Sequence, residues 1–112
     1  MIARIYTGPD NKTHLEELRL PPEDVDISAL QTAAGILFRR FPAGTFMDWH
    51  NAPRRQYIIT LEGQVEIGLG DGSVRRFGPG DVLLAEDLTG QGHTTRVIGD
   101  GPRLAAMVRL PE

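Results

Sequence analysis

The chain has 112 residues, of which 40% are apolar and 24% charged, and its formal net charge is −3. This length fits one globular domain that can bury a core without disulfides. The negative net charge argues against a nucleic-acid partner, because contacts to phosphates need a basic face. Cysteine is absent, which excludes disulfides, thiolate metal sites and a cysteine nucleophile.

The first residues, MIARIYTGPDNK, contain no long apolar run. They therefore predict neither a signal peptide nor a transmembrane helix. We expect a cytoplasmic protein with no membrane partner.

Glycine (13 residues) and proline (8 residues) are spread along the chain between short apolar segments. Short strands separated by regularly placed turn residues are typical of an all-β sandwich or barrel. Within one domain, we expect residues 1–34 to hold N-terminal strands and a turn, and residues 35–112 to form a β-barrel core.

The N-terminal part is the hardest to interpret. Ile2–Tyr6 is predicted to be a short strand, and His14–Leu20 either a strand or a helix that ends at Pro21 and Pro22. Acidic residues at 23–26 favour one helical turn, because negative charge near a helix N-terminus suits its dipole.

From residue 35 onward the pattern predicts a series of strands. They are expected at Ile36–Phe41, Arg55–Leu61, Val65–Leu69, Ser73–Phe77, Val82–Ala85, His93–Ile98 and Arg103–Leu110. Residues 65–69 alternate between apolar and other residues, which is the period of a half-buried strand. The Asp71-Gly72 pair predicts a hairpin, so the segment GLGDGS is interpreted as a turn and not as a phosphate-binding loop.

The segment Gly44–Gly63, GTFMDWHNAPRRQYIITLEG, has glycines at both ends and one histidine, His50, near its middle. This arrangement resembles the first motif of the cupin family. The segment Phe77–His93, FGPGDVLLAEDLTGQGH, resembles the second motif, in which a Pro-Gly-Asp turn, a strand and a loop precede a histidine. The resemblance implies a small antiparallel β-barrel of the double-stranded β-helix, or jelly-roll, type. It also implies a homodimer, in which Ile2–Tyr6 or His14–Leu20 could pair between subunits.

The resemblance also implies a metal site, but an incomplete one. A complete cupin site holds a divalent metal with three histidines and a glutamate; here His50 and His93 match two of them, while Ala52 and Gln56 occupy the other two positions. Two imidazoles and a neutral amide include no anionic donor, so affinity for Zn, Fe, Mn or Ni should be lower than at an intact site. On a regular strand Asp48 would share a face with His50 and could add a carboxylate. The candidate metal ligands are His50, Gln56 and His93.

Without a metal, the same residues suit acid–base chemistry. The candidate catalytic residues are His50, His93 and Glu86, because imidazole and carboxylate groups move protons near neutral pH. Glu86 is equally a candidate for binding loop amides, and this structural role is the favoured interpretation of Asp87.

Three further residues are candidates for substrate binding: Arg54, Gln56 and Trp49. By strand parity Arg54 shares a face with Ala52 and Gln56, so its guanidinium could bind a carboxylate or phosphate inside the barrel. A structural ion pair is the favoured alternative for Arg54, and a core or dimer contact is the alternative for Trp49.

The sequence leaves three classes of function open. The first is a small enzyme acting on a polar, anionic molecule of the sugar-acid or keto-acid type, by metal-assisted or acid–base isomerase, lyase or oxygenase chemistry. The second is a protein that binds such a molecule without turnover. The third is a structural protein with a degenerate metal site. The fold alone does not decide between them.

Overall fold

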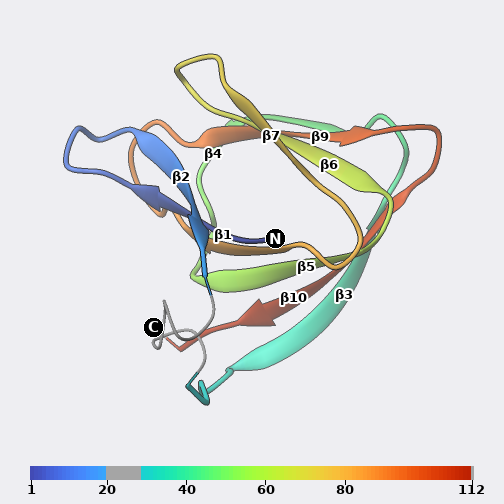
Figure 1. Cartoon of the computed structure of the whole chain (residues 1–112), viewed down its shortest axis with the longest axis horizontal. Coiled ribbons are helices and arrows are strands. Elements are labelled where there is room, and N and C mark those ends of the chain that lie inside the picture. Colours follow the sequence, from blue (N-terminus) through green and yellow to red (C-terminus); the bar gives the residue numbers. More distant parts are fainter. Residues whose placement is uncertain (20–28, 112) are drawn as a thin grey trace.

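The computed structural model describes residues 1–19 and 29–111, which form ten β-strands (Figure 1). The strands are β1 (Ile2–Thr7), β2 (Thr13–Leu18), β3 (Gly35–Phe41), β4 (Phe46–His50), β5 (Gln56–Glu62), β6 (Gln64–Gly68), β7 (Val74–Phe77), β8 (Val82–Glu86), β9 (His93–Ile98) and β10 (Arg103–Arg109). No helix in this part of the chain is long and apolar enough to span a membrane.

The strands form two facing sheets. The six-stranded sheet has the order β2-β1-β8-β5-β10-β3, and the four-stranded sheet has the order β4-β9-β6-β7; the latter lies above β5, β10 and β3 in Figure 1. Neighbouring strands are antiparallel except β1 and β8, which are parallel. The predicted all-β jelly-roll fold is confirmed, with one correction: the two sheets do not close into a continuous barrel.

The hydrophobic core occupies only part of the space between the sheets. It comprises Ala3, Ile5, Ala52, Val65, Ile67, Phe77, Leu83 and Ala85. Strand alternation explains which residues belong to the core. Val65 and Ile67 of β6, for example, point inward, while their neighbours are more exposed. The same alternation turns Arg103 and Arg109 of β10 inward, where they line a pocket. Four members of the core cluster, Ala52, Ile67, Leu83 and Ala85, line the same pocket, so the interior is partly apolar and partly polar.

The predicted strands from residue 35 onward are found within two residues of their expected ends. Residues of His14–Leu20 that the structure describes form strand β2, which decides between the two alternatives for that segment. The strand β4 was not among those predicted, and the predicted helical turn at 23–26 lies outside the described residues.

The N-terminal strands belong to the six-stranded sheet. β1 is paired on one side with β2 and on the other with β8, and its Ala3 and Ile5 are in the core. Both edges of Ile2–Tyr6 are thus occupied within one chain. Of the two segments expected to pair between subunits, only β2 is an edge strand with unpaired backbone groups.

A carboxylate at the end of β8 ties three segments together. The Glu86 side chain accepts hydrogen bonds from Arg4 Nε at 2.6 Å and from Arg55 Nε at 2.7 Å, which links β8 to β1 and to the start of β5. Burial by itself would raise the pKa of Glu86, but the hydrogen bonds from the two arginines outweigh it, so the pKa lies below its ordinary value of 4.5.

This network predicts a pH-dependent contribution to stability. A carboxyl group whose pKa is lowered by folding contributes fully above its unfolded pKa, here 4.5, and the contribution is lost as pH falls through the lowered folded value. We expect Glu86→Gln to reduce the free energy of unfolding by roughly 1–2 kcal/mol at neutral pH, with the deficit shrinking in acid. Urea unfolding at a series of pH values measures it.

Glu66→Gln is the matched control. Glu66 pairs with Arg76 at 3.1 Å, but the Arg76 side chain is 70% exposed. Exposed pairs contribute little, so a change below about 0.5 kcal/mol is expected. A Glu86→Gln deficit that is independent of pH would contradict the role assigned to the Glu86 charge.

Candidate functional site

A pocket of about 570 Å³ lies between the sheets, within the size range of small-molecule sites. Its lining residues come from both sheets and from the segment before β5: Arg39, Phe41, Met47, Asp48, His50, Asn51, Ala52, Pro53, Arg54, Gln56, Ile58, Ile67, Leu83, Ala85, His93, Thr95, Arg103, Met107 and Arg109. The structure therefore brings together four of the predicted site residues, namely His50, Arg54, Gln56 and His93.

His50 and His93 are direct neighbours on β4 and β9. The two residues pair in register, and their ring centroids are 4.5 Å apart. Gly92 makes this close approach possible: its φ is +78°, and a Cβ there would lie 2.3 Å from the carbonyl oxygen of His50. Only glycine adopts that backbone conformation without strain at such a distance.

A bulge in β4 sets the orientation of His50. Met47 is opposite Thr95 and His50 is opposite His93, so the ladder is irregular between Met47 and His50. The strand is thus irregular at Asp48, but Asp48 and His50 both line the pocket, as expected from a shared face. The backbone oxygen of Asp48 lies 2.7 Å from His50 Nδ1. Since a carbonyl only accepts, Nδ1 carries the proton, and Nε2 is left with a free lone pair.

His93 is held by a buried carboxylate. Its Nδ1 lies 2.5 Å from Oδ2 of Asp87, which is 0% exposed. The hydroxyl of Thr13 donates to the same oxygen at 3.4 Å, and Oδ1 of Asp87 has no partner among the described residues. The expectation that Asp87 binds loop amides is not met; the side chain instead fixes the ring of His93 and leaves Nε2 for the pocket.

Two predicted site residues do not line the pocket. Alternation along β8 turns Ala85 inward and Glu86 to the opposite face, where the carboxylate is held by Arg4 and Arg55. Trp49 is 49% exposed and lies between Asp48 and His50, which both line the pocket, so alternation turns it outward. In the described part of the chain, neither Glu86 nor the Trp49 side chain forms a hydrogen bond with His50 or His93.

The charge of the pocket is strongly positive. Four arginines line it: Arg39, Arg54, Arg103 and Arg109. Among the described residues, Asp48 is the one acidic residue in the lining. In the described part of the chain none of the four guanidinium groups forms an ion pair, so the ion pair favoured for Arg54 is not observed there.

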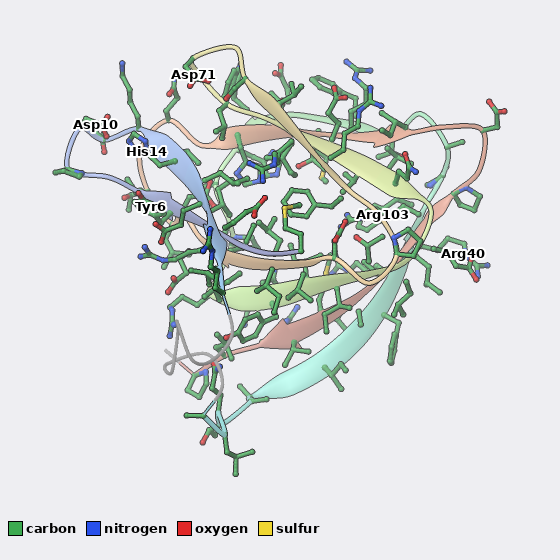
Figure 2. All side chains as sticks on the ribbon, in the orientation of Figure 1. Tyr6, Asp10, His14, Arg40, Asp71 and Arg103 are labelled. Atoms are coloured by element: carbon green, nitrogen blue, oxygen red, sulfur yellow. The ribbon has the colours of Figure 1, made fainter. Side chains whose placement is uncertain are left out.

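Arg103 is the most deeply placed of these charges, and the sequence indicated it only as the start of a strand. It is 5% exposed; one Nη donates to Thr60 Oγ1 at 3.2 Å, and Nε is buried without a partner (Figure 2). Burial lowers the pKa of Arg103 well below its ordinary value, to about 10. One pKa unit corresponds to about 1.4 kcal/mol, so burial of this charge costs roughly 3 kcal/mol. An arginine that shares the inward parity of Ala105 and Met107 is the signal that could have identified it.

The pocket residues do not fit a divalent metal centre. Within residues 1–19 and 29–111, no three His, Cys, Asp or Glu side chains gather where they could hold a metal ion. The candidate ligands His50, Gln56 and His93 provide two imidazoles and a neutral amide, without the carboxylate that would offset a divalent charge. The four arginines add repulsion between the pocket and any cation.

The chain matches no protein-family model and no curated protein. It is similar to several solved structures. One is an uncharacterised conserved protein with a double-stranded β-helix domain from Klebsiella pneumoniae, with a TM-score of 0.54 and 21% identity over 73% of this chain and 76% of that chain. A conserved protein of unknown function from Streptococcus pyogenes has a TM-score of 0.51 and 18% identity, over 74% and 69%.

A cupin 2 conserved barrel domain protein from Salinispora arenicola has a TM-score of 0.50 and 17% identity, over 86% of this chain and 91% of that chain. At these identities the similarity concerns the fold and not the function. The chain has a double-stranded β-helix fold, as these solved structures do.

Proposed function

We propose that this small cupin binds a small organic anion of the sugar-acid or keto-acid type in the pocket between its sheets. The observation that carries this proposal is the buried guanidinium of Arg103, which has no carboxylate partner among the described residues. A buried charge without a counter-charge is costly, and a carboxylate ligand is the planar partner whose two oxygens match the guanidinium fork.

The electrostatics of the pocket support the proposal. The whole chain has a net charge of −3, whereas the pocket lining carries four arginines and one aspartate. Charges of one sign inside a cleft with low-dielectric walls concentrate the field there and attract ligands of the opposite sign. The amide of Gln56 and the free Nε2 atoms of His50 and His93 add hydrogen-bonding groups for a polar ligand.

A second candidate function is proton transfer on that ligand. The buried Asp87–His93 pair favours it, because a carboxylate at Nδ1 orients the ring and stabilises the imidazolium that forms when Nε2 accepts a proton. His50 lies beside His93 and offers a second Nε2 for the return of the proton. This arrangement suits isomerase or lyase chemistry next to a carboxylate, whereas the donor set gives no support to metal-assisted or oxygenase chemistry.

The structural-protein alternative has less support. Decay of the site would leave the interior free to fill with apolar side chains. Instead His50, Arg54, Gln56 and His93 converge on one open pocket, together with an arginine whose burial is costly. The presence of the buried Arg103 is easier to explain if its guanidinium binds an anionic ligand.

Arg103→Met separates binding from structure. Replacing an unpaired buried charge by an apolar side chain of similar length should leave the ligand-free protein as stable as before, or raise its stability by about 1–3 kcal/mol. Binding of pyruvate, gluconate and hexanoate should weaken by roughly tenfold or more. Thermal unfolding with and without each acid measures both effects.

Arg40→Met is the control, because Arg40 projects outward from β3 (Figure 2). It should change neither property. An Arg103→Met protein that is less stable than the wild type and binds these acids unchanged would show that Arg103 is structural.

Metal titration tests the donor set. We expect weak Zn²⁺ binding to the wild-type chain, and an increase of about a hundredfold or more in Ala52→His/Gln56→Glu, which adds an imidazole and a carboxylate beside the histidine pair. Isothermal calorimetry measures both. Tight stoichiometric binding to the wild type that is lost in His50→Ala would contradict the metal-free interpretation.

Solvent exchange tests proton transfer without knowledge of the product. Incubation of pyruvate and related keto acids in D₂O, followed by NMR, should show protein-catalysed exchange of the hydrogens next to the carbonyl. His93→Gln should reduce the rate by roughly a hundredfold or more, and Asp87→Asn by less. Binding without exchange would favour the non-catalytic function.

A further inference from the structure

We propose that the ligand of this pocket is a diacid: an α,ω-dicarboxylate whose two acidic groups are joined by an apolar spacer. This inference rests on the proposed function and deepens it, because it assigns two separate anion subsites to the pocket. The geometry of β10 carries it.

Two guanidinium groups on β10 have unsatisfied donors. Nε of Arg103 and Nε of Arg109 are both buried without a partner among the described residues, and both side chains line the pocket. Buried polar hydrogens are rarely left unpaired in folded proteins. Each guanidinium group thus belongs to a side chain that lines the pocket and has no carboxylate partner among the described residues, and an acid in the pocket would supply one.

The two arginines stand at opposite ends of one strand. They are the first and last residues of β10, with the same inward parity. At about 3.3 Å per residue their Cα atoms are roughly 20 Å apart. A single carboxylate is too small to contact both guanidinium groups unless both side chains fold back to the middle of the strand. A molecule with two acidic groups could instead place one of them at Arg103 and the other at Arg109.

A second arginine accompanies each end. Near Arg103, the neighbouring strand β3 contributes Arg39, which pairs in register with Ala105 and lines the pocket. At the other end, Arg109 pairs with Gln56 of β5, and Arg54 precedes Gln56 on the same face. Each subsite thus has two cationic groups, which suits a fully ionised carboxylate.

The wall between the two ends is apolar. Met107 of β10 is in register with Ile58 of β5, and Ile58 is in register with Leu83 of β8. All three line the pocket and form a row across the sheet. A hydrocarbon spacer would bury its surface against this row, whereas a hydroxylated spacer would lose hydrogen bonds to water there.

The Arg109 end lies next to the histidine pair. The amide of Ala52, two residues before Arg54, donates to the backbone oxygen of Asp87 at 3.2 Å, and Asp87 holds His93. One acidic group of the diacid would therefore lie by the histidines, and the other would lie at the far, deeply buried Arg103. The affinity of the pocket for a diacid should therefore depend on the length of the spacer between its two acidic groups.

A chain-length series tests the inference. Calorimetric titrations compare succinate, glutarate, adipate, pimelate and suberate, each with the monocarboxylate of the same number of carbons. We expect a length optimum, at which the diacid binds at least tenfold more tightly than its matched monoacid. The reach of each arginine side chain sets where the optimum falls, so the series locates it.

Variants at the two ends should act on different carboxylates of the same ligand. Arg103→Met and Arg109→Gln should each weaken the optimal diacid by roughly tenfold to a hundredfold and remove its advantage over the monoacid. Arg103→Lys, which keeps the charge but loses the planar fork, is the second variant if Arg103→Met does not fold. Arg40→Gln, on the outer face of β3, should have no effect.

The outcomes separate this inference from the proposed function. Monoacids that bind in an Arg103-dependent way, with no gain from a second carboxylate, would leave the proposed function intact and overturn the diacid. A diacid advantage that does not depend on length would also overturn it, since unrelated surface charges would explain that result. If no carboxylate binds at all, both proposals are wrong.

Discussion

The interior of this protein is organised around a buried charge that has no counter-charge among residues 1–19 and 29–111. Arg103 is almost fully buried between the sheets, with Thr60 as its one hydrogen-bond partner in the described structure and no carboxylate beside it. A burial cost of about 3 kcal/mol is a large part of the 5–15 kcal/mol by which domains are usually stable. The apolar cluster between β1, β6 and β8 has to offset that cost. The space between the sheets thus contains an apolar cluster that stabilises the folded state and a buried arginine that destabilises it.

Two adjacent carboxylates at the end of β8 show how strand alternation divides these tasks. Glu86 faces the outer arginines of β1 and of the segment before β5, and it joins three segments of the sheet. Asp87, one residue later, faces the opposite way and is completely buried against His93. A single step along the chain therefore separates a structural ion-pair network from a group that orients a pocket residue. Exchanging their roles would require only a shift of one residue in register.

Turn residues and the two-residue period predicted the strands from residue 35 onward except β4. The resemblance of Gly44–Gly63 and Phe77–His93 to two cupin motifs placed His50 and His93 in one site. Other features depend on contacts between distant segments. The bulge at Asp48 and Trp49 arises from how β4 meets β9, and no local pattern indicates it. Strand parity placed Arg54 correctly, but parity does not say whether an inward face meets a packed core or an open pocket. For that reason Arg103 was missed, and neither the arginine partners of Glu86 nor the contact of Asp87 with His93 was expected.

The residues at the usual ligand positions bear on how the pocket can acquire a positive charge. A divalent ion held by histidines and a glutamate gives an anionic ligand a positive partner at the centre of a site, and the ion needs carboxylate donors to remain bound. Here Ala52 and Gln56 supply neither an imidazole nor a negative charge, so the histidines keep free Nε2 atoms. Positive charge comes instead from arginines on three elements around the pocket. Unlike one ion, arginines can be spaced apart along a strand. A pocket built in this way can recognise the distance between two negative groups as well as the presence of one.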